Sequence, residues 1–438
     1  MTTPSRFPWL LALLVLTLAG CSGDQRPAAS AHDADLALYR SVLDRVRTSY
    51  VDPVNNGQLI DNSLKGMLTG LDPHSDYMSE QEYQEMQDDT AGEFAGIGAE
   101  LTRNDSHPVV VSPIDDTPAA RAGIQAGDII LRIDGQVTEG MSLKDVVTAL
   151  RGPADTPVKI TIARKNDPPF DVTLTRAIIK VVSVKSQLEP GGIGYIRITS
   201  FTETTQREVT KALDDMRSQA GGHFQGFVLD LRNDPGGLLD QAVRVAGDFL
   251  DGGTTVSIRG RSADDNRIFP APANGDHIKG VPMVVLINGA SASAAEIVAG
   301  ALQDRQRAEV LGTQSFGKGS VQTIIPLEGH GALRLTTARY YTPNGRSIQG
   351  TGITPDRIVE QPKTPKTAEA EIVREANLPH ALNTGLAAKS DGGAAAGTNQ
   401  PTTETIIESA AIGSAQDYQL QTALTELGRM HAQASENR

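Results

Sequence analysis

Cysteine, tryptophan and basic residues are scarce in this chain of 438 residues. Its single cysteine excludes an internal disulfide and a zinc site built from several thiolates. The 40 Lys and Arg residues are outnumbered by 53 Asp and Glu residues, and the net charge of -13 argues against a nucleic-acid partner, which needs a basic surface. The hydrophobic content of 39% is still enough for two or three modest globular domains.

A short apolar run lies near the start of the chain. It follows Arg6, extends over residues 9–16, and is too short to span a bilayer but suits a secretory signal. The run ends in Leu18-Ala19-Gly20-Cys21, which resembles the lipobox of bacterial lipoproteins, although a buried thiol without a role is the alternative. The resemblance implies that Cys21 is lipidated, and Ser22 after it favours the outer membrane. We therefore expect a periplasmic, lipid-anchored protein.

The periodicity of the remaining chain changes several times. Apolar residues at helical spacing over 36–50 predict helices that serve packing or dimer contact. From about residue 92 short β-like runs alternate with turns, and from about residue 178 strands alternate with helices. Ala, Gly, Thr and Ser accumulate after Pro365, as is typical of a linker. Apolar residues at helical spacing near the end of the sequence then predict a helix that docks on a partner or on the core. The predicted parts are a signal peptide (1–20), a tether (21–33), an N-terminal helical region (34–90), a β-rich module (91–177), an α/β core (178–362), a linker (363–402) and a C-terminal helix (403–438).

The core is predicted to carry the chemistry at the ends of its strands. Its strands are expected at 193–201, 226–231 and 281–287, and its helices at 204–216, 238–250 and 292–302.

One strand leads through a turn of small residues into a helix over 284–296, which places serine hydroxyls at a helix start. Ser291 or Ser293 could be a nucleophile, or could only cap the helix. None of the eight histidines has the setting of a triad member, which disfavours a Ser-His-Asp hydrolase. Lys318, between two glycines ahead of a strand, could act as the base if burial lowers its pKa by roughly three units; a solvated turn lysine is the alternative.

Several segments resemble those of one protease family. Residues 230–237, 288–297 and 316–322 are similar to the signature segments of the carboxyl-terminal processing proteases, also called tail-specific proteases (peptidase family S41A). The resemblance extends from about 35 to 360 and includes residues 72–75, 94–98 and 341–350. It implies an α/β serine protease core of the ClpP/crotonase-like kind that needs no metal and no organic cofactor.

The same resemblance assigns roles to individual residues. Ser293 corresponds to the nucleophile, Lys318 to the general base, and Gln322 to the residue that orients the lysine amine. The backbone N–H groups of Ala294 and Gly237 correspond to the oxyanion donors. Ala295 is a departure, because the family often has serine there.

The β-rich module resembles a PDZ domain. Gly96-Ile97-Gly98 is similar to the loop that binds a terminal carboxylate, and residues 118–130 resemble a further part of that fold. Gly96, Ile97 and Gly98 are therefore expected to bind peptide. Arg151 is expected to couple tail binding to the active site, or to be a plain surface arginine.

The sequence thus predicts a multidomain α/β and β-rich serine endopeptidase with helices at both ends, which selects proteins by their C-terminal tails. The alternative is a catalytically silent PDZ lipoprotein that tethers a partner at the cell envelope. The helical termini suggest a homo-oligomer, and whether an adaptor protein activates the enzyme is left open by the sequence.

Overall fold

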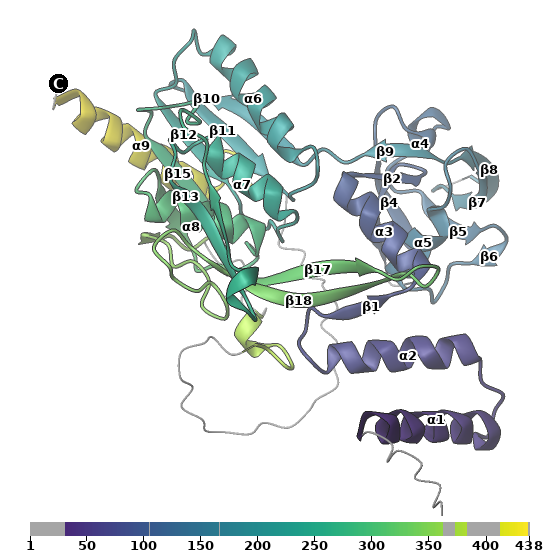
Figure 1. Ribbon diagram of the computed structural model, residues 1–438. Coiled ribbons are helices and arrows are strands. Elements are labelled where there is room, and N and C mark those ends of the chain that lie inside the picture. The colour runs from purple at the N-terminus through teal and green to yellow at the C-terminus, as the bar shows by residue number, and fades with distance from the viewer. Residues whose placement is uncertain (1–30, 105, 166, 362–372, 383–411, 437–438) are drawn as a thin grey trace, which may run out of the picture. The chain divides into compact units, whose positions relative to one another are not determined.

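The computed structural model describes residues 31–104, 106–165, 167–361, 373–382 and 412–436 (Figure 1). The chain divides into two compact units, Met1–Asn62 and Ser63–Arg438. Cys21 and the predicted signal peptide lie outside the described residues. Within the described part, no helix combines the length and the apolar character needed to cross a membrane.

The first unit contains helix α1 (Ala31–Ser49) and the start of α2 (Asn56–Thr69). α1 confirms the helical spacing over 36–50. The large apolar side chains at this spacing are nevertheless exposed in the described structure, among them Leu36, Leu38, Tyr39 and Val42. The first unit alone therefore does not bury the apolar face of α1.

The second unit continues with the end of α2, strand β1 (Asp76–Met78) and helix α3 (Glu80–Ala91). Ser79 caps α3, because its N–H donates to Glu82 Oε2 at 2.9 Å and its hydroxyl accepts from the Glu82 N–H at 3.3 Å. The helix ends at Gly92, whose φ of 75° is a left-handed conformation suited to glycine. The helical region therefore includes a short strand that its periodicity does not reveal.

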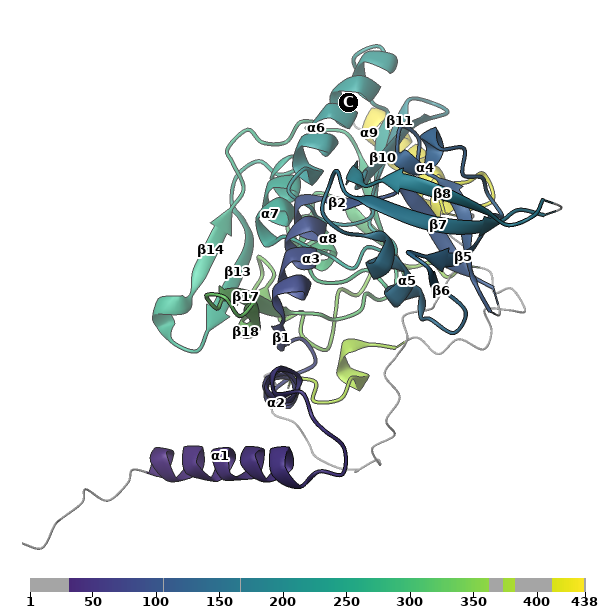
Figure 2. The ribbon, with the colours of Figure 1, turned by 90° about the vertical axis from the view of Figure 1, so that its right-hand side faces the viewer.

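The β-rich module is confirmed as a compact domain with its own core. Its main sheet has the strand order β3-β4-β5-β7-β8, with β6 paired to β5, while β2 and β9 form a separate pair. The neighbouring strands β7 and β8 of this sheet lie side by side in Figure 2. Fully buried aliphatic residues alternate along β7 at Val158, Ile160 and Ile162. The elements are β2 (Glu93–Gly96), β3 (Ala99–Arg103), β4 (Pro108–Pro113), α4 (Pro118–Arg121), β5 (Ile129–Ile133), β6 (Gln136–Val137), α5 (Leu143–Leu150), β7 (Pro157–Ala163), β8 (Phe170–Thr175) and β9 (Ala177–Lys180).

The α/β core is built on a six-stranded sheet with the order β10-β11-β12-β15-β16-β19. β10 and β11 are antiparallel, and the other neighbours are parallel. All six elements predicted for the core are present, with ends that differ by a few residues. The elements are β10 (Val184–Glu189), β11 (Ile193–Ile198), α6 (Thr205–Gln219), β12 (Gly226–Asp230), α7 (Leu239–Gly247), β15 (Met283–Ile287), α8 (Ala294–Asp304), β16 (Glu309–Gly312) and β19 (Arg357–Ile358).

Helices cover both faces of this sheet. Alternate residues of β12 enter different hydrophobic clusters: Phe227 and Leu229 pack with α6, α7 and α8, whereas Val228 packs with α9 (Tyr418–Glu436). α9 contributes the buried side chains Leu420, Ala423 and Leu427. The C-terminal helix therefore docks on the core.

A second sheet in this unit has the order β1-β18-β13-β14, with β17 paired to β18. β17 and β18 form a long hairpin (Figure 1). The sequence patterns do not predict this sheet, because β1 and β13 are far from β18 along the chain. Its elements are β13 (Thr254–Gly260), the 3-10 turn η1 (Ala263–Asp265), β14 (Arg267–Pro270), β17 (Ser320–Pro326) and β18 (Ala332–Tyr341).

Part of the segment predicted as a linker is folded. Residues 373–382 contain the 3-10 turn η2 (Glu375–Asn377), and the side chain of Glu375 is fully buried. The rest of the predicted linker lies outside the described residues. The Ala- and Gly-rich composition of 363–402 does not reveal this short packed stretch.

Candidate active site

Ser293 occupies the turn between β15 and α8 with an unusual backbone conformation. Its φ of 53° and ψ of −111° lie outside the regions that residues with side chains prefer, which costs roughly 1–3 kcal/mol. The residue is 6% exposed. A strained turn that presents a serine at the start of a helix is the device by which α/β hydrolases display a nucleophile.

Ser291, the other serine considered, has a structural role. Its Oγ donates to the Leu231 carbonyl oxygen at 2.7 Å and accepts from the Asn288 N–H at 2.9 Å. These contacts tie the turn before α8 to the end of β12. Because the hydroxyl of Ser291 is used by the backbone, Ser293 is the better candidate for chemistry.

One buried carboxylate joins the Ser293 turn to the loop that carries Lys318. Glu296 Oε2 accepts from the backbone N–H groups of Ser293 at 2.8 Å and Lys318 at 2.9 Å. Its Oε1 accepts from the Gly317 N–H at 2.7 Å and from the Ser315 hydroxyl at 2.5 Å. Burial raises the pKa of Glu296 to about 7, although these hydrogen bonds oppose the increase. The sequence motif contains Glu296, but only the structure reveals this role.

The amine of Lys318 lies in largely dehydrated surroundings. Burial is the main cause that lowers its pKa, and the positive charge of Arg334 acts in the same direction. The carboxylates of Glu375, Glu296 and Asp72 oppose them. Among the described residues, Lys318 Nζ has no hydrogen-bond or ion-pair partner. The direction of the shift is the one that a lysine base requires.

Gln322 does not contact the amine of Lys318 in the described structure. Its Nε2 donates to Ser320 Oγ at 2.9 Å and to Thr336 Oγ1 at 3.2 Å. The physical reason is the strand register: Gln322 is paired with Thr336 on β18, directly after a register shift between Val321 and Gln322. Gln322 thus belongs to the site's surroundings, while the expected hydrogen bond to the lysine is absent from this conformation.

Tyr340 is a neighbour of Ser293 that the sequence motifs do not single out. A hydrogen bond with the Ser293 side chain lowers the pKa of Tyr340, but burial dominates and raises it to about 12. The Tyr340 N–H also donates to the Gly319 carbonyl oxygen at 2.7 Å. Tyr340 therefore contacts both the serine and the residue after Lys318. Its only sequence signal is its position directly before the recognised stretch 341–350.

The glycine turn after β12 lies against Ser293. A Cβ on Gly236 would lie 2.8 Å from Ser293 Cβ and 2.9 Å from Ala294 N, so no larger residue fits there. Gly237 has a φ of 143°, and its Cβ would lie 2.2 Å from the Phe201 carbonyl oxygen. In the described structure the N–H groups of Gly237 and Ala294 have no acceptor. The two predicted oxyanion donors are thus on segments that meet at Ser293.

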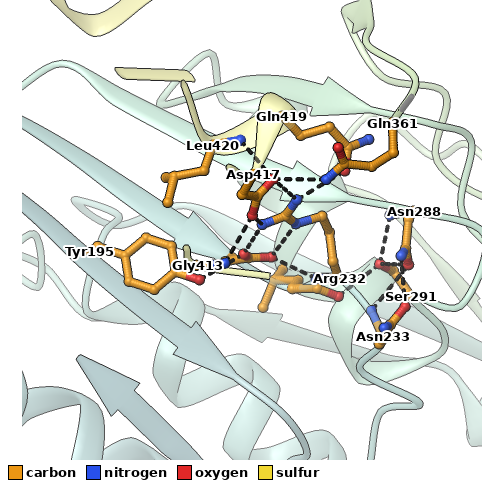
Figure 3. A network of polar contacts seen from close by, with 12 residues as sticks. Tyr195, Arg232, Asn233, Asn288, Ser291, Gln361, Gly413, Asp417, Gln419 and Leu420 are labelled. Carbon is orange, nitrogen blue, oxygen red and sulfur yellow. Dashed lines mark hydrogen bonds and ion pairs between the residues drawn. The ribbon is translucent and has the colours of Figure 1, made fainter. Parts of the chain in front are cut away.

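A buried charge network holds the end of β12 (Figure 3). The Arg232 guanidinium is 1% exposed and bonds both carboxylate oxygens of Asp230, at 2.9 and 2.5 Å. It also bonds both oxygens of Asp417, at 2.8 and 2.5 Å, just before α9. Tyr195 Oη donates to Asp230 at 2.8 Å. The C-terminal segment thereby helps to position the turn that contains Gly236 and Gly237.

The predicted carboxylate-binding loop lies between β2, which ends at Gly96, and β3. The Ile97 side chain is buried in the module core, and the N–H groups of Ile97 and Gly98 have no acceptor among the described residues. Gly98 has a φ of 76°, and a Cβ there would lie 2.3 Å from Thr117 Cβ. β3 is an edge strand of its sheet. A peptide strand can therefore be added beside β3 with its terminus at these amides.

Arg151 follows α5 and contacts other elements instead of projecting freely from the surface. Its guanidinium lies 3.2 Å from Asp89 of α3 and 4.8 Å from the ring centroid of Phe94. Arg151 therefore connects the end of α5 to α3 and β2.

The described residues include neither a histidine bonded to Ser293 nor a cluster of metal-ligating side chains. No histidine forms a hydrogen bond or ion pair with Ser293 there. No group of three or more His, Cys, Asp or Glu side chains suited to a metal ion occurs among the described residues.

Glu296 leads to a prediction about pH and stability. Its pKa is about 7 in the folded protein against 4.5 when exposed, so the folded state binds the proton more tightly. Protonated Glu296 therefore contributes fully to the free energy of unfolding below pH 4.5. This contribution is lost as the pH rises through 7, a change of about 3 kcal/mol. We expect the free energy of unfolding of the wild type to fall by this amount relative to Glu296→Gln over that range, measured by urea denaturation and circular dichroism.

Glu328→Gln is the matched control, because Glu328 is exposed at the tip of the β17–β18 hairpin. The difference between the wild type and this control should not change with pH. If the difference in free energy of unfolding between the wild type and Glu296→Gln also does not change with pH, the pKa of Glu296 is not raised.

Comparisons with known proteins identify the family of the chain. The family model described as Peptidase family S41 matches residues 192–359, and the PDZ domain model matches residues 109–164. The carboxy-terminal-processing protease of Bartonella bacilliformis is 54% identical over 329 residues, which are 75% of this chain and 75% of that protein. Carboxy-terminal processing protease CtpA of Bacillus subtilis is 33% identical over 336 residues, 76% of this chain and 71% of that protein.

Among solved structures, a photosystem II D1 C-terminal processing protease is 31% identical, covers 75% of this chain and 93% of its own, and has a TM-score of 0.44. The identities and coverage of the two bacterial relatives establish the family. The chain belongs to peptidase family S41, as a serine-type carboxy-terminal processing protease with a PDZ domain.

Proposed function

We propose that this protease uses Ser293 and Lys318 as a catalytic dyad. The observation that carries the proposal is the shared carboxylate of Glu296, which binds the N–H groups of both residues and keeps their segments adjacent. The dehydrated position of Lys318 supports its role as a base, because an amine must be uncharged to accept a proton.

The chemical steps follow those of a Ser-Lys enzyme. Lys318 Nζ accepts the Ser293 hydroxyl proton while Oγ attacks the scissile carbonyl carbon. The ammonium then returns the proton to the leaving amine as the peptide bond breaks and an acyl ester remains on Ser293. Water, deprotonated by Lys318, hydrolyses that ester.

The oxyanion of each tetrahedral intermediate is proposed to bind the N–H groups of Gly237 and Ala294. Both groups lack an acceptor in the described structure, and both segments are fixed by close backbone contacts at Gly236. One such donor is worth about 3 kcal/mol of transition-state stabilisation. The Ser293 side chain also interacts with Tyr340.

The dyad makes a direct prediction for substitutions. Ser293→Ala and Lys318→Arg are each expected to lower kcat on fluorescein-labelled β-casein by about a thousandfold or more, since arginine cannot lose its proton at neutral pH. Lys185→Arg, at an exposed position on β10, is the matched control and should retain full activity. An active Lys318→Arg enzyme would remove the lysine from the mechanism, and equal inertness of all variants and the wild type would favour the PDZ scaffold.

We further propose that the PDZ domain selects substrates by their C-terminal tails. The free amides of Ile97 and Gly98 and the open edge of β3 together suit a terminal carboxylate followed by an extended chain. Through its contacts with Asp89 of α3 and Phe94 of β2, Arg151 is proposed to couple tail binding at the Gly96–Gly98 loop to elements outside the main sheet of the PDZ domain.

Tail selection is testable by binding measurements. The measurement is the fluorescence anisotropy of a labelled apolar peptide with the Ser293→Ala protein, which is expected not to cut it. Amidation of the peptide's C-terminus should weaken binding tenfold or more, because it removes the charge that strengthens hydrogen bonds to the loop amides. Equal affinities for the free acid and the amide would contradict carboxylate recognition.

The anchor at Cys21 is a proposal from the sequence alone, supported by the apolar run over 9–16 and the residues before the cysteine. Expressed in a bacterium with an outer membrane, the full chain should fractionate with that membrane, and Cys21→Ser should appear in the soluble periplasmic fraction. Retention of the variant in the membrane fraction would contradict lipid anchoring at Cys21. Homo-oligomerisation stays a prediction, supported by the exposed apolar face of α1.

A further inference from the structure

Residues 373–382 place an acidic side chain beside the catalytic loop. Glu375 is fully buried, which is rare for a glutamate unless its carboxylate has specific partners. It follows the core in the sequence and is separated from it by residues outside the described part. A buried carboxylate in a stretch with the composition of a linker calls for a role.

The partners of Glu375 come from three separate segments. Glu375 Oε1 accepts from Gln349 Nε2 at 2.7 Å, and Oε2 lies 2.8 Å from His74 Nε2. The Glu375 N–H donates to the Phe316 carbonyl oxygen at 3.3 Å. His74 belongs to the motif at 72–75, for which the dyad itself provides no use.

These contacts hold the Lys318 loop on both sides of the lysine. Phe316 lies two residues before Lys318, and the Gly319 N–H directly after it donates to Gln349 Oε1 at 2.9 Å. Gln349 thus connects the backbone beside Lys318 to the Glu375 carboxylate. The position of Glu375 relative to the lysine loop is therefore well determined by hydrogen bonds.

Four charged groups act on the Lys318 amine: Arg334, Glu375, Glu296 and Asp72. The carboxylate of Glu296 accepts from three backbone N–H groups and a hydroxyl. Asp72 is similarly occupied by the backbone and hydroxyl groups of its own turn and by Thr336. Glu375 has only His74 and Gln349 as side-chain partners, and it has the largest effect on Lys318 among the three carboxylates.

We propose that Glu375 is a positioning residue for proton transfer, whose carboxylate, held by His74 and Gln349, stabilises the ammonium that Lys318 becomes when it accepts the serine proton. Its role is analogous to that of the acid that orients and stabilises the base in a catalytic triad. The inference rests on the proposed role of Lys318 as the base. It also gives the His74 motif a purpose, because His74 fixes the carboxylate in place.

Glu375→Gln tests the proposal, because it removes the charge but keeps the size of the side chain and an oxygen that accepts from Gln349 Nε2. Without the carboxylate the ammonium is less favoured. We therefore expect the acid limb of the pH profile of kcat/KM, measured with fluorescein-labelled β-casein, to move to lower pH by about half to one unit. The plateau at high pH should fall about tenfold. Glu328→Gln, the same change at an exposed site, should alter neither quantity.

Two further variants separate the possible failures. Glu375→Asp keeps the charge, so its acid limb should stay near the wild-type position even if a shorter side chain lowers the plateau. A Glu375→Gln enzyme with a reduced plateau and an unmoved acid limb would show that Glu375 only supports the loop, and would overturn the inference. If Lys318→Arg retains activity, the proposed dyad is wrong, and so is the role of Glu375 that rests on it. If Lys318→Arg is inactive but Glu375→Gln leaves the acid limb of the pH profile at its wild-type position, only the inference about Glu375 is refuted.

Discussion

The proposed active site depends on one buried carboxylate that is shared by two chain segments. Glu296 lies on the first turn of α8, and its oxygens bind the N–H groups of Ser293, Gly317 and Lys318. Without that shared acceptor, three buried amides would lack partners, at a cost of about 1–3 kcal/mol each. The carboxylate also compensates for the strained backbone of Ser293. The turn and the loop are therefore held together by hydrogen bonds to one side chain.

The lysine experiences two opposing influences. Loss of water and the charge of Arg334 favour the uncharged amine, whereas nearby carboxylates favour the ammonium. A base needs both: it must be neutral before the reaction and stabilised when it becomes charged. Without nearby carboxylates, burial would lower the pKa of the Lys318 amine so far that it could not accept the serine proton. Without burial, the carboxylates would keep the amine protonated before the reaction. The surroundings of Lys318 combine the two with charged groups from β18, α8, η2 and the turn at Asp72.

The sequence predicts the local elements of this protein well and its long-range contacts poorly. The alternation of strands and helices over 193–302 suffices for the core sheet, because each element has a clear period. The sheet that contains β1, β13 and β18 escapes prediction, since its partners are separated by large parts of the chain. Ser293 and Lys318 are proposed as site residues because family motifs contain them. Tyr340 and Glu375 carry no motif of their own, and the actual partner of Gln322 depends on a shift in strand register.

The last helix has a bearing on how the protein matures. α9 seals one face of the central sheet, and Asp417 supplies the second carboxylate around the buried Arg232. A growing polypeptide that has not yet reached this point would leave the Arg232 guanidinium with only the two carboxylate oxygens of Asp230 as side-chain acceptors, and a row of aliphatic side chains facing water. One face of the central sheet therefore stays uncovered until the residues of α9 have been synthesised. Folding of this core during synthesis is therefore coupled to the appearance of α9 and not to the central strands alone.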